Sequence, residues 1–387
     1  MTENITVIFV YPHSDPLDPA GSGGQNRLYN FIIKMVDRYN VSVIGQKFGN
    51  DVPKNIETIV YDGKTPGFVS DLDYSLAGHL YKSIRTQSPD IIHIPYPSGI
   101  VLSKLLSILI RSDTSVVLDA HDVMTERAKQ FDNRNLGAIT KHSRKIYIPT
   151  LESIATRVAD HVITVSEKDA KLMEQLNGIH RNKITVIPNG ADPVDQTELT
   201  PRESVRDELG LGPDTVGLVF HGNYETGTHN LEAAERIIDV IAPQFSDRTD
   251  VQFFIIGKGT PETDLENVTT LGFVDDLYST LNAMDLAVVP LTSGTATKLK
   301  MFDYMSVGLP IVSTEKGTEG IELEHNKHVL CSDTDTEQFV SSIERLLEDD
   351  ALRDRLRRNA RRLIKEKYNW DTIGGRLNDV YENLIDR

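Results

Sequence analysis

The stretch SGTATKLKMFDYMSVGLPIVST, from Ser293 to Thr314, decides how the second half of the chain is interpreted. It begins with small residues, becomes basic at Lys298 and Lys300, continues as an apolar helical pattern and ends in Gly-Leu-Pro before a β-branched run. Glycine followed by proline is typical of a helix end, and β-branched residues are typical of a strand. The stretch therefore predicts a loop, a helix over Leu299–Val307 and a strand.

Strand and helix patterns alternate along the whole chain. Many of the expected strands are continuously apolar, which is typical of strands covered on both faces in a parallel sheet. The expected strands are Ile5–Tyr11, Val41–Gly45, Ile56–Tyr61, Ile91–Tyr96, Val116–His121, His161–Val165, Ile184–Ile187, Val216–His221, Val251–Ile256, Val268–Phe273, Leu286–Leu291, Pro310–Ser313 and His328–Cys331. Helical patterns lie between them at Gln25–Asp37, Tyr74–Thr86, Ser143–Ala159, Asn230–Ile241 and Leu299–Val307. This alternation predicts an α/β protein with crossover connections.

The length of 387 residues favours two domains rather than one. The segment ADPVDQTELTPRESVRDELGLGPD, residues 191–214, is polar and contains three prolines, which is typical of a linker with a short helix. We therefore predict two Rossmann-like doubly wound parallel-sheet domains, with the first over residues 1–195 and the second over residues 196–369.

The composition restricts the class of protein. A hydrophobic fraction of 39% and a charged fraction of 25% are typical of a globular chain. The net charge of −16 disfavours nucleic-acid binding, because phosphate contacts need clustered cations. Cys331 is the only cysteine, which excludes an internal disulfide and fits a reducing compartment. No basic segment precedes the first apolar run, so we expect no signal peptide and a cytoplasmic location.

Two segments allow a second interpretation at a membrane surface. The apolar stretch Gly99–Ile110 is shorter than the roughly 20 residues that span a bilayer, and Lys104 interrupts it. A buried or half-buried helix is its plainer interpretation, and a patch on a membrane surface is the alternative. The arginines between Arg353 and Arg362 are interpreted as a solvated helix face, with anionic-lipid contact as the alternative.

A glycine-rich loop follows the first expected strand. The segment AGSGGQNRLYNF, from Ala20 to Phe31, places Gly23 and Gly24 at the start of a helix, where backbone N–H groups can approach a phosphate or a sugar. A dinucleotide-binding G-x-G-x-x-G pattern needs glycine where Asn26 stands, so a Rossmann dehydrogenase is disfavoured. A flexible turn before a helix is the alternative.

A histidine stands at the end of another expected strand. In VVLDAHDVMTE, from Val116 to Glu126, the strand ends at His121. Ligands of doubly wound sheets bind beyond the carboxyl ends of strands, so His121 is a candidate acid, base or hydrogen-bond donor. A structural role is the alternative. No second histidine lies at a chelating spacing, so a metal site is disfavoured here.

The second domain contains two further candidate loops, each followed by a helix. In VFHGNYETGTHN, residues 219–230, a strand is followed by Gly222 and Asn223 and then by a helix. In the stretch quoted first, the backbone from Gly294 to Thr297, including Thr295, can present N–H groups, and Lys298 and Lys300 can neutralise a diphosphate. Asp303 lies one turn further on, where a carboxylate suits the two hydroxyls of a ribose. An ordinary junction between a loop and a helix is the alternative.

Other sites are disfavoured by the sequence. The triplets Asp71–Asp73 and Asp333–Asp335 resemble a metal-binding D-x-D motif, but such triplets are expected by chance in an acidic chain. No Ser/His/Asp set and no G-x-S-x-G motif is apparent. We therefore expect no metal and no resident cofactor.

Taken together, these motifs resemble the GT-B glycosyltransferases, and most of all the retaining family 4 (group 1) enzymes. The similar segments are GSGGQNRLYNF, PDIIHIPYP, DAHDV, ADHVITVSEKDAKLM, ITVIPNGAD, LGFVDDLYSTLNAMDLAVVPL and GTATKLKMFDYMSVGLPIVST, and they span nearly the whole chain. The segment YNWDTIGGRLNDVYENLI resembles the helix that crosses back onto the first domain in this fold, over about residues 370–387.

The resemblance implies a nucleotide-sugar donor in the second domain, with the diphosphate near Gly222, Asn223, Lys298 and Lys300 and the ribose at Asp303. It also implies an acceptor in the first domain, with Gly23, Gly24 and His121 facing a deep cleft between the domains. The sugar is then transferred with retention and without a metal, because lysines and helix dipoles replace the cation. Many family 4 enzymes carry Glu-x7-Glu where this chain has Thr295 and Asp303, so the first glutamate is lost.

The expected activity is therefore a retaining hexosyl transfer from a nucleotide-diphosphate sugar to a glycan, glycolipid or lipid-linked acceptor in polysaccharide or glycoconjugate biosynthesis. Peripheral contact with the inner membrane face is included in this expectation. A sugar-nucleotide 2-epimerase of the same fold and a non-catalytic glycan- or nucleotide-binding protein are the alternatives.

Overall fold

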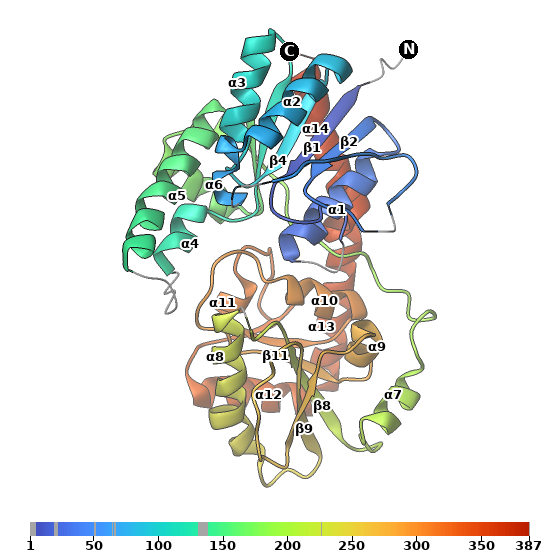
Figure 1. Ribbon diagram of the computed structural model, residues 1–387. Helices are drawn as coiled ribbons and strands as arrows, with labels where there is room; N and C mark the ends of the chain where they lie inside the picture. The colour runs from blue at the N-terminus through green and yellow to red at the C-terminus, as the bar shows by residue number, and fades with distance from the viewer. Residues whose placement is uncertain are drawn as a thin grey trace. The chain divides into compact units, whose positions relative to one another are not determined.

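The structure is a computed structural model of the 387-residue chain. It describes residues 5–18, 22–49, 52–63, 65, 67–130, 138–225 and 227–386. The chain forms two compact units, one of Met1–Asn189 with Trp370–Arg387 and one of Gly190–Asn369 (Figure 1). These divisions lie next to the domain boundaries expected at 195/196 and 369/370.

The first unit contains a parallel sheet of seven described strands in the order β3-β2-β1-β4-β5-β6-β7. The strands are β1 (Thr6–Tyr11), β2 (Asn40–Gly45), β3 (Glu57–Val60), β4 (Ile91–Pro95), β5 (Ser115–Ala120), β6 (His161–Thr164) and β7 (Ile184–Val186). Each lies within one residue of an expected strand or inside it, because the apolar runs of the sequence are the buried strands.

Helices cover both faces of this sheet. They are α1 (Gly23–Met35), α2 (Tyr74–Gln87), α3 (Ile100–Ile110), α4 (Met124–Gln130), α5 (Ala138–Val158), α6 (Glu167–Asn177) and α14 (Trp370–Ile385), with the short turns η1 (Gly67–Leu72) and η2 (Arg181–Lys183). Val7 and Phe9 of β1 pack in one apolar cluster with α1 and α14, whereas Ile8 and Val10 pack in another with α2 and α6. Both faces of β1 are therefore buried, which explains its continuous apolar sequence. Helix α14 comes from the C-terminal end of the chain and lies against α1 (Figure 1).

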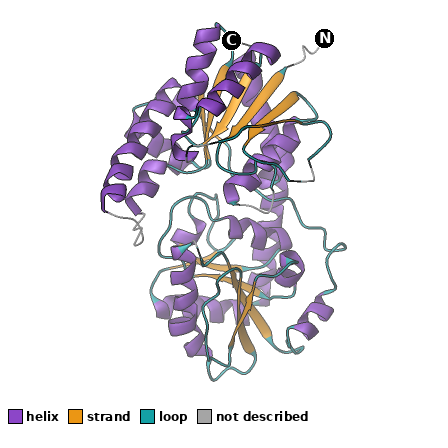
Figure 2. Cartoon of the chain, viewed as in Figure 1, coloured by secondary structure: helices purple, strands orange, loops and turns teal. Residues whose placement is uncertain are grey.

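The second unit contains a parallel sheet of six described strands in the order β10-β9-β8-β11-β12-β13. The strands are β8 (Val216–His221), β9 (Val251–Ile256), β10 (Val268–Gly272), β11 (Leu286–Val289), β12 (Ile311–Thr314) and β13 (Leu330–Ser332). The helical elements are α7 (Arg202–Glu208), α8 (Thr228–Arg236), η3 (Ile237–Ile241), η4 (Ala242–Phe245), α9 (Leu277–Asn282), α10 (Leu299–Val307), α11 (Glu315–Thr318), α12 (Thr336–Glu348), α13 (Asp350–Leu363) and η5 (Ile364–Tyr368). Figure 2 shows the strands of each unit between layers of helices.

Three helix expectations differ from the structure by more than one residue. The helix expected over Gln25–Asp37 corresponds to α1, which spans Gly23–Met35. The helix expected over Asn230–Ile241 is α8 followed by the π-helical turn η3, and α10 has the bounds expected for it. The expected Ser143–Ala159 helix corresponds to α5, which begins at Ala138.

The order of the strands reverses beside β1 in the first unit and beside β8 in the second. Ligands of such sheets bind outside the carboxyl ends of the strands at these reversal points. The loop before α1 follows β1, and the loops before α8 and α10 follow β8 and β11. The topology of each unit therefore places its glycine-rich loop at the binding edge.

Candidate functional site

Gly222 and Asn223 directly follow β8 at the binding edge of the second unit. A Cβ atom at Gly222 would lie 2.9 Å from the Asn230 side chain and 3.1 Å from Lys300 Nζ, so only glycine lets the backbone come this close. The Asn230 amide joins the two loops: its Nδ2 donates to the Asn223 carbonyl at 3.0 Å, and its Oδ1 accepts from Lys300 Nζ at 2.8 Å. The structure therefore brings Gly222, Asn223 and Lys300 together.

Lys300 is buried, with 7% of its surface exposed. Its ammonium lies 3.7 Å from the centre of the Phe220 ring, and no ion pair joins it to a carboxylate among the described residues. Burial, and then the charge of Lys298, hold the pKa of Lys300 well below its usual value, against the attraction of Asp303. The Phe220 ring and a single amide oxygen compensate the charge of this buried ammonium only in part. It is therefore suited to an anionic ligand.

The helices at this edge add partial positive charge. Neither α8, which follows Gly227, nor α10, which follows Lys298, has a side-chain cap at its start. The N–H groups of the first turn of a helix have no partner within the helix and carry its positive dipole end. Both helix starts can therefore donate to an anion beside Lys300.

Lys298 is bound to its own loop. Its Nζ donates to the carbonyl oxygens of Thr295 at 2.6 Å and of Ala296 at 3.0 Å. Gly294 and Ala296 have positive φ angles of 104° and 57° in this loop. The ammonium of Lys298 therefore stabilises a strained loop, and it differs in this respect from Lys300, to which the sequence assigned the same task.

Asp303 lies on α10 with its carboxylate partly occupied. Tyr278 Oη donates to Asp303 Oδ1 at 3.2 Å, and His221 Nε2 lies 3.4 Å from Asp303 Oδ2. The His221 backbone N–H donates to the buried Tyr304 hydroxyl at 2.9 Å, which fixes the end of β8 against α10. Because each carboxylate oxygen has two lone pairs, Asp303 keeps acceptor capacity for hydroxyl groups.

In the first unit, the start of α1 meets two aromatic side chains. Ser22 caps the helix in a capping box with Gln25, and Gly23 is the first helical residue. A Cβ atom at Gly24 would lie 2.3 Å from Tyr96 Oη and 2.8 Å from His121 Nδ1. The glycine at position 24 is therefore required for this close approach, and the structure brings Gly23, Gly24 and His121 together.

The Nε2 edge of the His121 ring contacts a buried carboxylate. Its Nε2 lies 2.7 Å from Asp119 Oδ2, and its ring packs on Tyr96 with the ring centres 4.9 Å apart. Burial acts to raise the pKa of Asp119, but the charges of Arg27 and His121 hold it well below its usual value. A charged carboxylate requires a hydrogen on Nε2, so a lone pair on this ring can only be on Nδ1. Nδ1 is buried and has no hydrogen-bond partner among the described residues.

The chain matches two family models, one in each unit. Residues 21–195 match the model described as Glycosyltransferase Family 4, and residues 215–349 match the model described as Glycosyl transferases group 1. The chain belongs to the group 1 glycosyltransferases with the GT-B fold. Both models describe transferases, and so they favour sugar transfer over the 2-epimerase considered from the sequence.

Similar proteins include transferases and a solved structure. This chain is 24% identical over 253 residues to an uncharacterized glycosyltransferase of Methanocaldococcus jannaschii. The match covers 61% of this chain and 63% of that protein. It is 23% identical over 319 residues to the UDP-Gal:α-D-GlcNAc-diphosphoundecaprenol α-1,3-galactosyltransferase of Escherichia coli, covering 79% of this chain and 78% of that protein. The Anabaena protein HepE in complex with UDP has the same fold, with a TM-score of 0.73 at 16% identity, over 98% of this chain and 100% of that chain.

Sequence reasoning missed several residues that the glycosyltransferase places beside these sites. In the second unit they are His221, Asn230, Tyr278 and Tyr304, and in the first unit they are Arg27, Tyr96 and Asp119. Two signals were present: Asp119 is a charged residue inside a continuously apolar strand, and His221 is a polar residue at the end of another. His13 was also missed, and burial together with the charge of His121 lowers its pKa to about 4.

The two D-x-D triplets have structural roles in the glycosyltransferase. Asp71 accepts the backbone N–H groups of Gly99 and Leu102, and Asp73 caps α2. Asp335 caps α12. Among the residues that the structure describes, no cluster of three His, Cys, Asp or Glu side chains is arranged to hold a metal ion.

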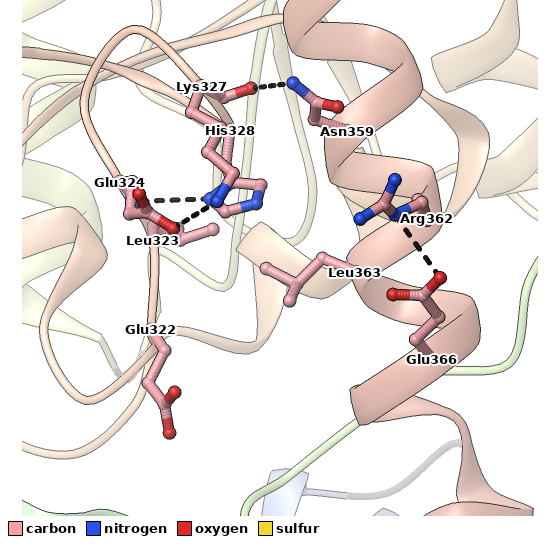
Figure 3. A pocket seen from close by; sticks show the side chains of 9 residues that line it. All are labelled: Glu322, Leu323, Glu324, Lys327, His328, Asn359, Arg362, Leu363 and Glu366. Atoms are coloured by element: carbon pink, nitrogen blue, oxygen red, sulfur yellow. Dashed lines mark hydrogen bonds and ion pairs between the residues drawn. The ribbon is translucent and has the colours of Figure 1, made fainter.

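A cavity of about 390 Å³ in the second unit contains none of the expected site residues. It is lined by Glu322, Leu323, Glu324, Lys327, His328, Asn359, Arg362, Leu363 and Glu366, from the loop before β13 and from α13 and η5 (Figure 3). Lys327 pairs with Glu324 at 2.6 Å, and Arg362 pairs with Glu366 at 3.3 Å. Because these charges neutralise one another, the cavity is a poor candidate for the diphosphate.

Within the described parts of the glycosyltransferase, no helix has the length and apolar character needed to cross a bilayer. Helix α3, which contains the apolar stretch noted in the sequence, buries Ile100 but exposes Leu105, Ile108 and Leu109. The half-buried helix expected there is therefore present, with an apolar outer face.

Proposed function

We propose that the chain transfers a hexose, with retention and without a metal, from a nucleotide-diphosphate sugar to a glycan, glycolipid or lipid-linked acceptor. The observation that carries this proposal is the buried ammonium of Lys300, which lies beside the Gly222 backbone and two uncapped helix starts. A diphosphate supplies the negative charge that this edge lacks. Asp303, one turn along α10, is then the partner for the ribose hydroxyls.

The donor is proposed from the same edge. The Anabaena protein HepE was solved with UDP and with UDP-glucose, and the Escherichia coli relative uses UDP-Gal by its name. UDP-sugars are therefore the first donors to test. The region from Gly294 to Thr297 lies next to the diphosphate contacts, and Thr295 stands where many family members carry a glutamate. We expect donor-sugar recognition to differ from those members at this position.

In the proposed reaction, the bond between the anomeric carbon and the β-phosphate oxygen breaks, a bond to the acceptor oxygen forms, and the proton of the acceptor hydroxyl passes to the departing diphosphate. Charge develops on the departing diphosphate, where Lys300 and the starts of α8 and α10 stabilise it in place of a metal ion. His121 is proposed to contact the sugar, with Nδ1 accepting from a hydroxyl while Asp119 binds Nε2. Gly23 and Gly24 leave room for this contact.

The acceptor and the location are proposed together. The Escherichia coli relative acts on a diphosphoundecaprenol-linked sugar by its name. On α3, the outward side chains Leu105, Ile108 and Leu109 are 61%, 63% and 73% exposed. An apolar helix face of this kind suits a protein that works from the cytoplasm at the inner membrane face, where lipid-linked acceptors are reached.

The test is a thermal-shift screen with UDP-glucose, UDP-galactose and GDP-mannose, followed by turnover with a lipid-linked acceptor and determination of the anomeric configuration by NMR. A ligand at 100 times its Kd stabilises by about 2.7 kcal/mol, which is readily detected. Lys300→Ala removes the shift, and Lys327→Ala, in a surface ion pair of the same unit, keeps it. A product of inverted configuration, or a nucleotide shift that survives Lys300→Ala, contradicts the proposal.

A further inference from the structure

A chain of buried polar side chains lies behind His121 and reaches the C-terminal helix. Arg27, His93, Asp119 and Tyr381 come from α1, β4, β5 and α14, and each is 1% exposed or less. Buried polar groups are unfavourable unless they are paired, so four of them in one apolar core require a reason. Of the four, only Asp119 has a part in the contacts proposed above, as the partner of His121 Nε2.

Asp119 is the centre of this network. Arg27 donates to it in bidentate fashion, from Nε to Oδ2 at 3.0 Å and from Nη2 to Oδ1 at 2.9 Å. The remaining Arg27 donors go to the carbonyl oxygens of Ile187 and Pro188 at 2.9 and 2.8 Å and to Asn189 Oδ1 at 3.2 Å. Arg27 is thereby satisfied, and it fixes the plane of the Asp119 carboxylate so that Oδ2 faces His121.

His93 and Tyr381 approach Asp119 from the other side. Tyr381 Oη lies 2.8 Å from His93 Nδ1, and His93 Nε2 lies 3.6 Å from Asp119 Oδ2. Burial lowers the pKa of His93, so the ring is neutral and carries a single hydrogen. If that hydrogen were on Nδ1, the Nε2 lone pair would face the carboxylate, which is repulsive. Tyr381 therefore donates to Nδ1, and the Nε2–H of His93 is directed toward Asp119 at 3.6 Å, which is longer than a hydrogen bond.

We propose that Asp119 and Tyr381 are positioning residues for His121, which together hold it as the Nε2–H tautomer with the Nδ1 lone pair directed at Gly24. Asp119 sets the tautomer directly, and Tyr381 acts through His93 by keeping the positive end of the Nε2–H dipole directed toward the same carboxylate oxygen. The part that assigns Nδ1 to a sugar hydroxyl rests on the proposed function. The part that assigns the tautomer does not.

The tautomer is measured directly by long-range ¹⁵N–¹H NMR of the protein with ¹⁵N-labelled histidine, with the His121 signals assigned by their loss in His121→Gln. In the wild type we expect a protonated-type Nε2 and an unprotonated Nδ1. Asp119→Asn replaces the carboxylate by an amide that can donate to Nε2, so the hydrogen moves to Nδ1. Tyr381→Phe leaves His93 free to change tautomer, and the His121 signals become a mixture of the two forms.

Turnover of UDP-glucose, measured as UDP release, gives the second readout. Asp119→Asn is expected to lower kcat by roughly 10²-fold or more, the scale of a tautomer error in catalytic histidines. Tyr381→Phe is expected to lower kcat by about 3- to 10-fold, the range for one buried hydrogen bond. The KM for UDP-glucose stays within about twofold in both variants, since the diphosphate and ribose contacts proposed for the donor lie in the second unit.

Tyr39→Phe is the matched control. The Tyr39 hydroxyl is also hydrogen-bonded to α14, at 2.6 Å from Asn378 Oδ1, and its ring packs on Tyr381, but neither of these contacts involves Asp119. It is expected to keep the wild-type tautomer and kcat. A wild-type His121 spectrum in both Asp119→Asn and Tyr381→Phe, or an equal fall of kcat in Tyr39→Phe and Tyr381→Phe, overturns the inference. If Asp119→Asn does not fold because Arg27 loses its partner, Tyr381→Phe alone decides.

The inference and the proposed function fail separately. Absence of sugar transfer in the wild type with every donor refutes the proposed function, while the tautomer spectra still test the inference. Transfer in the wild type with unchanged spectra in the variants refutes the inference alone.

Discussion

Replacement of Lys300 by methionine is predicted to stabilise the free protein and to weaken nucleotide binding at the same time. Methionine keeps an unbranched chain of similar length against Phe220 and removes only the ammonium, whose described polar contact is Asn230 at 2.8 Å. The depressed pKa of Lys300 shows that burial of its charge is unfavourable. Removing an uncompensated buried charge is expected to raise the free energy of unfolding by about 1 kcal/mol or more. For a unit of this size, each such kcal/mol raises Tm by about 2–4 °C.

The sign of the pH dependence follows from the same pKa. The folded-state pKa of Lys300 lies below its unfolded value of about 10.4, so between the two the unfolded state binds more protons. The stability of the wild type therefore rises with pH across that window, and the rise is absent in Lys300→Met. The advantage of the variant is largest below the folded-state pKa and disappears above about pH 10.4. Calorimetric unfolding of both proteins over this range measures the difference.

Nucleotide binding is predicted to change in the opposite direction. A hydrogen bond to a charged group contributes about 1.5–3 kcal/mol, which corresponds to a loss of roughly 10- to 150-fold in affinity for UDP. The diphosphate also raises the pKa of Lys300, so the wild type takes up protons on binding and its affinity falls as the pH increases. Titration calorimetry with UDP in two buffers of different ionisation enthalpy gives the affinity and the proton uptake.

Lys327→Met is the control, because Lys327 pairs with Glu324 at 2.6 Å on the surface of the same unit. It is expected to bind UDP as the wild type does. The reasoning is refuted if Lys300→Met binds UDP within about twofold of the wild type, or if it melts at a lower temperature at neutral pH.

Three further predictions concern the two sites. Gly24→Ala is expected to lower the free energy of unfolding by about 1–3 kcal/mol, because the added methyl group overlaps the Tyr96 hydroxyl. The double variant Gly24→Ala, Tyr96→Phe is expected to recover part of this loss. Chemical denaturation measures both variants, and equal losses in the two contradict the close contact. Asp303→Asn is expected to weaken UDP by about 3- to 30-fold and 2′-deoxy-UDP by less; an equal effect on the two ligands removes Asp303 from the ribose. Turnover in excess EDTA is expected to match turnover without it, and a loss restored by Mg²⁺ contradicts metal independence.

The elements of this fold were predictable because of the way parallel sheets are covered. Strands buried on both faces need apolar residues at most successive positions, so β8 and β9 appear in the sequence as mainly apolar runs with the bounds that the structure has. The rule that ligands bind at the carboxyl ends of strands then selected His121, Gly222 and the loop before α10 without any knowledge of contacts. Local pattern and topology together were sufficient for these positions.

The roles of equivalent-looking residues were not predictable. Lys298 and Lys300 lie two positions apart and looked alike in sequence, yet one donates to the carbonyls of its own loop and the other is buried against Phe220. Both side chains are buried, so they differ in the partners that the tertiary structure supplies, and no side-chain pattern records these partners.

The stretch from Ser293 to Thr314, by its own residues, determined a loop, a helix and a strand, because local propensity and apolar periodicity act over a few neighbouring positions. The surroundings of His121 were decided only by the tertiary structure. Arg27 meets Asp119 across 92 residues, and Tyr381 meets His93 across 288. Such pairs depend on the packing of α1 and α14 against the same sheet, and a charge buried by distant elements leaves no periodic signal in the sequence.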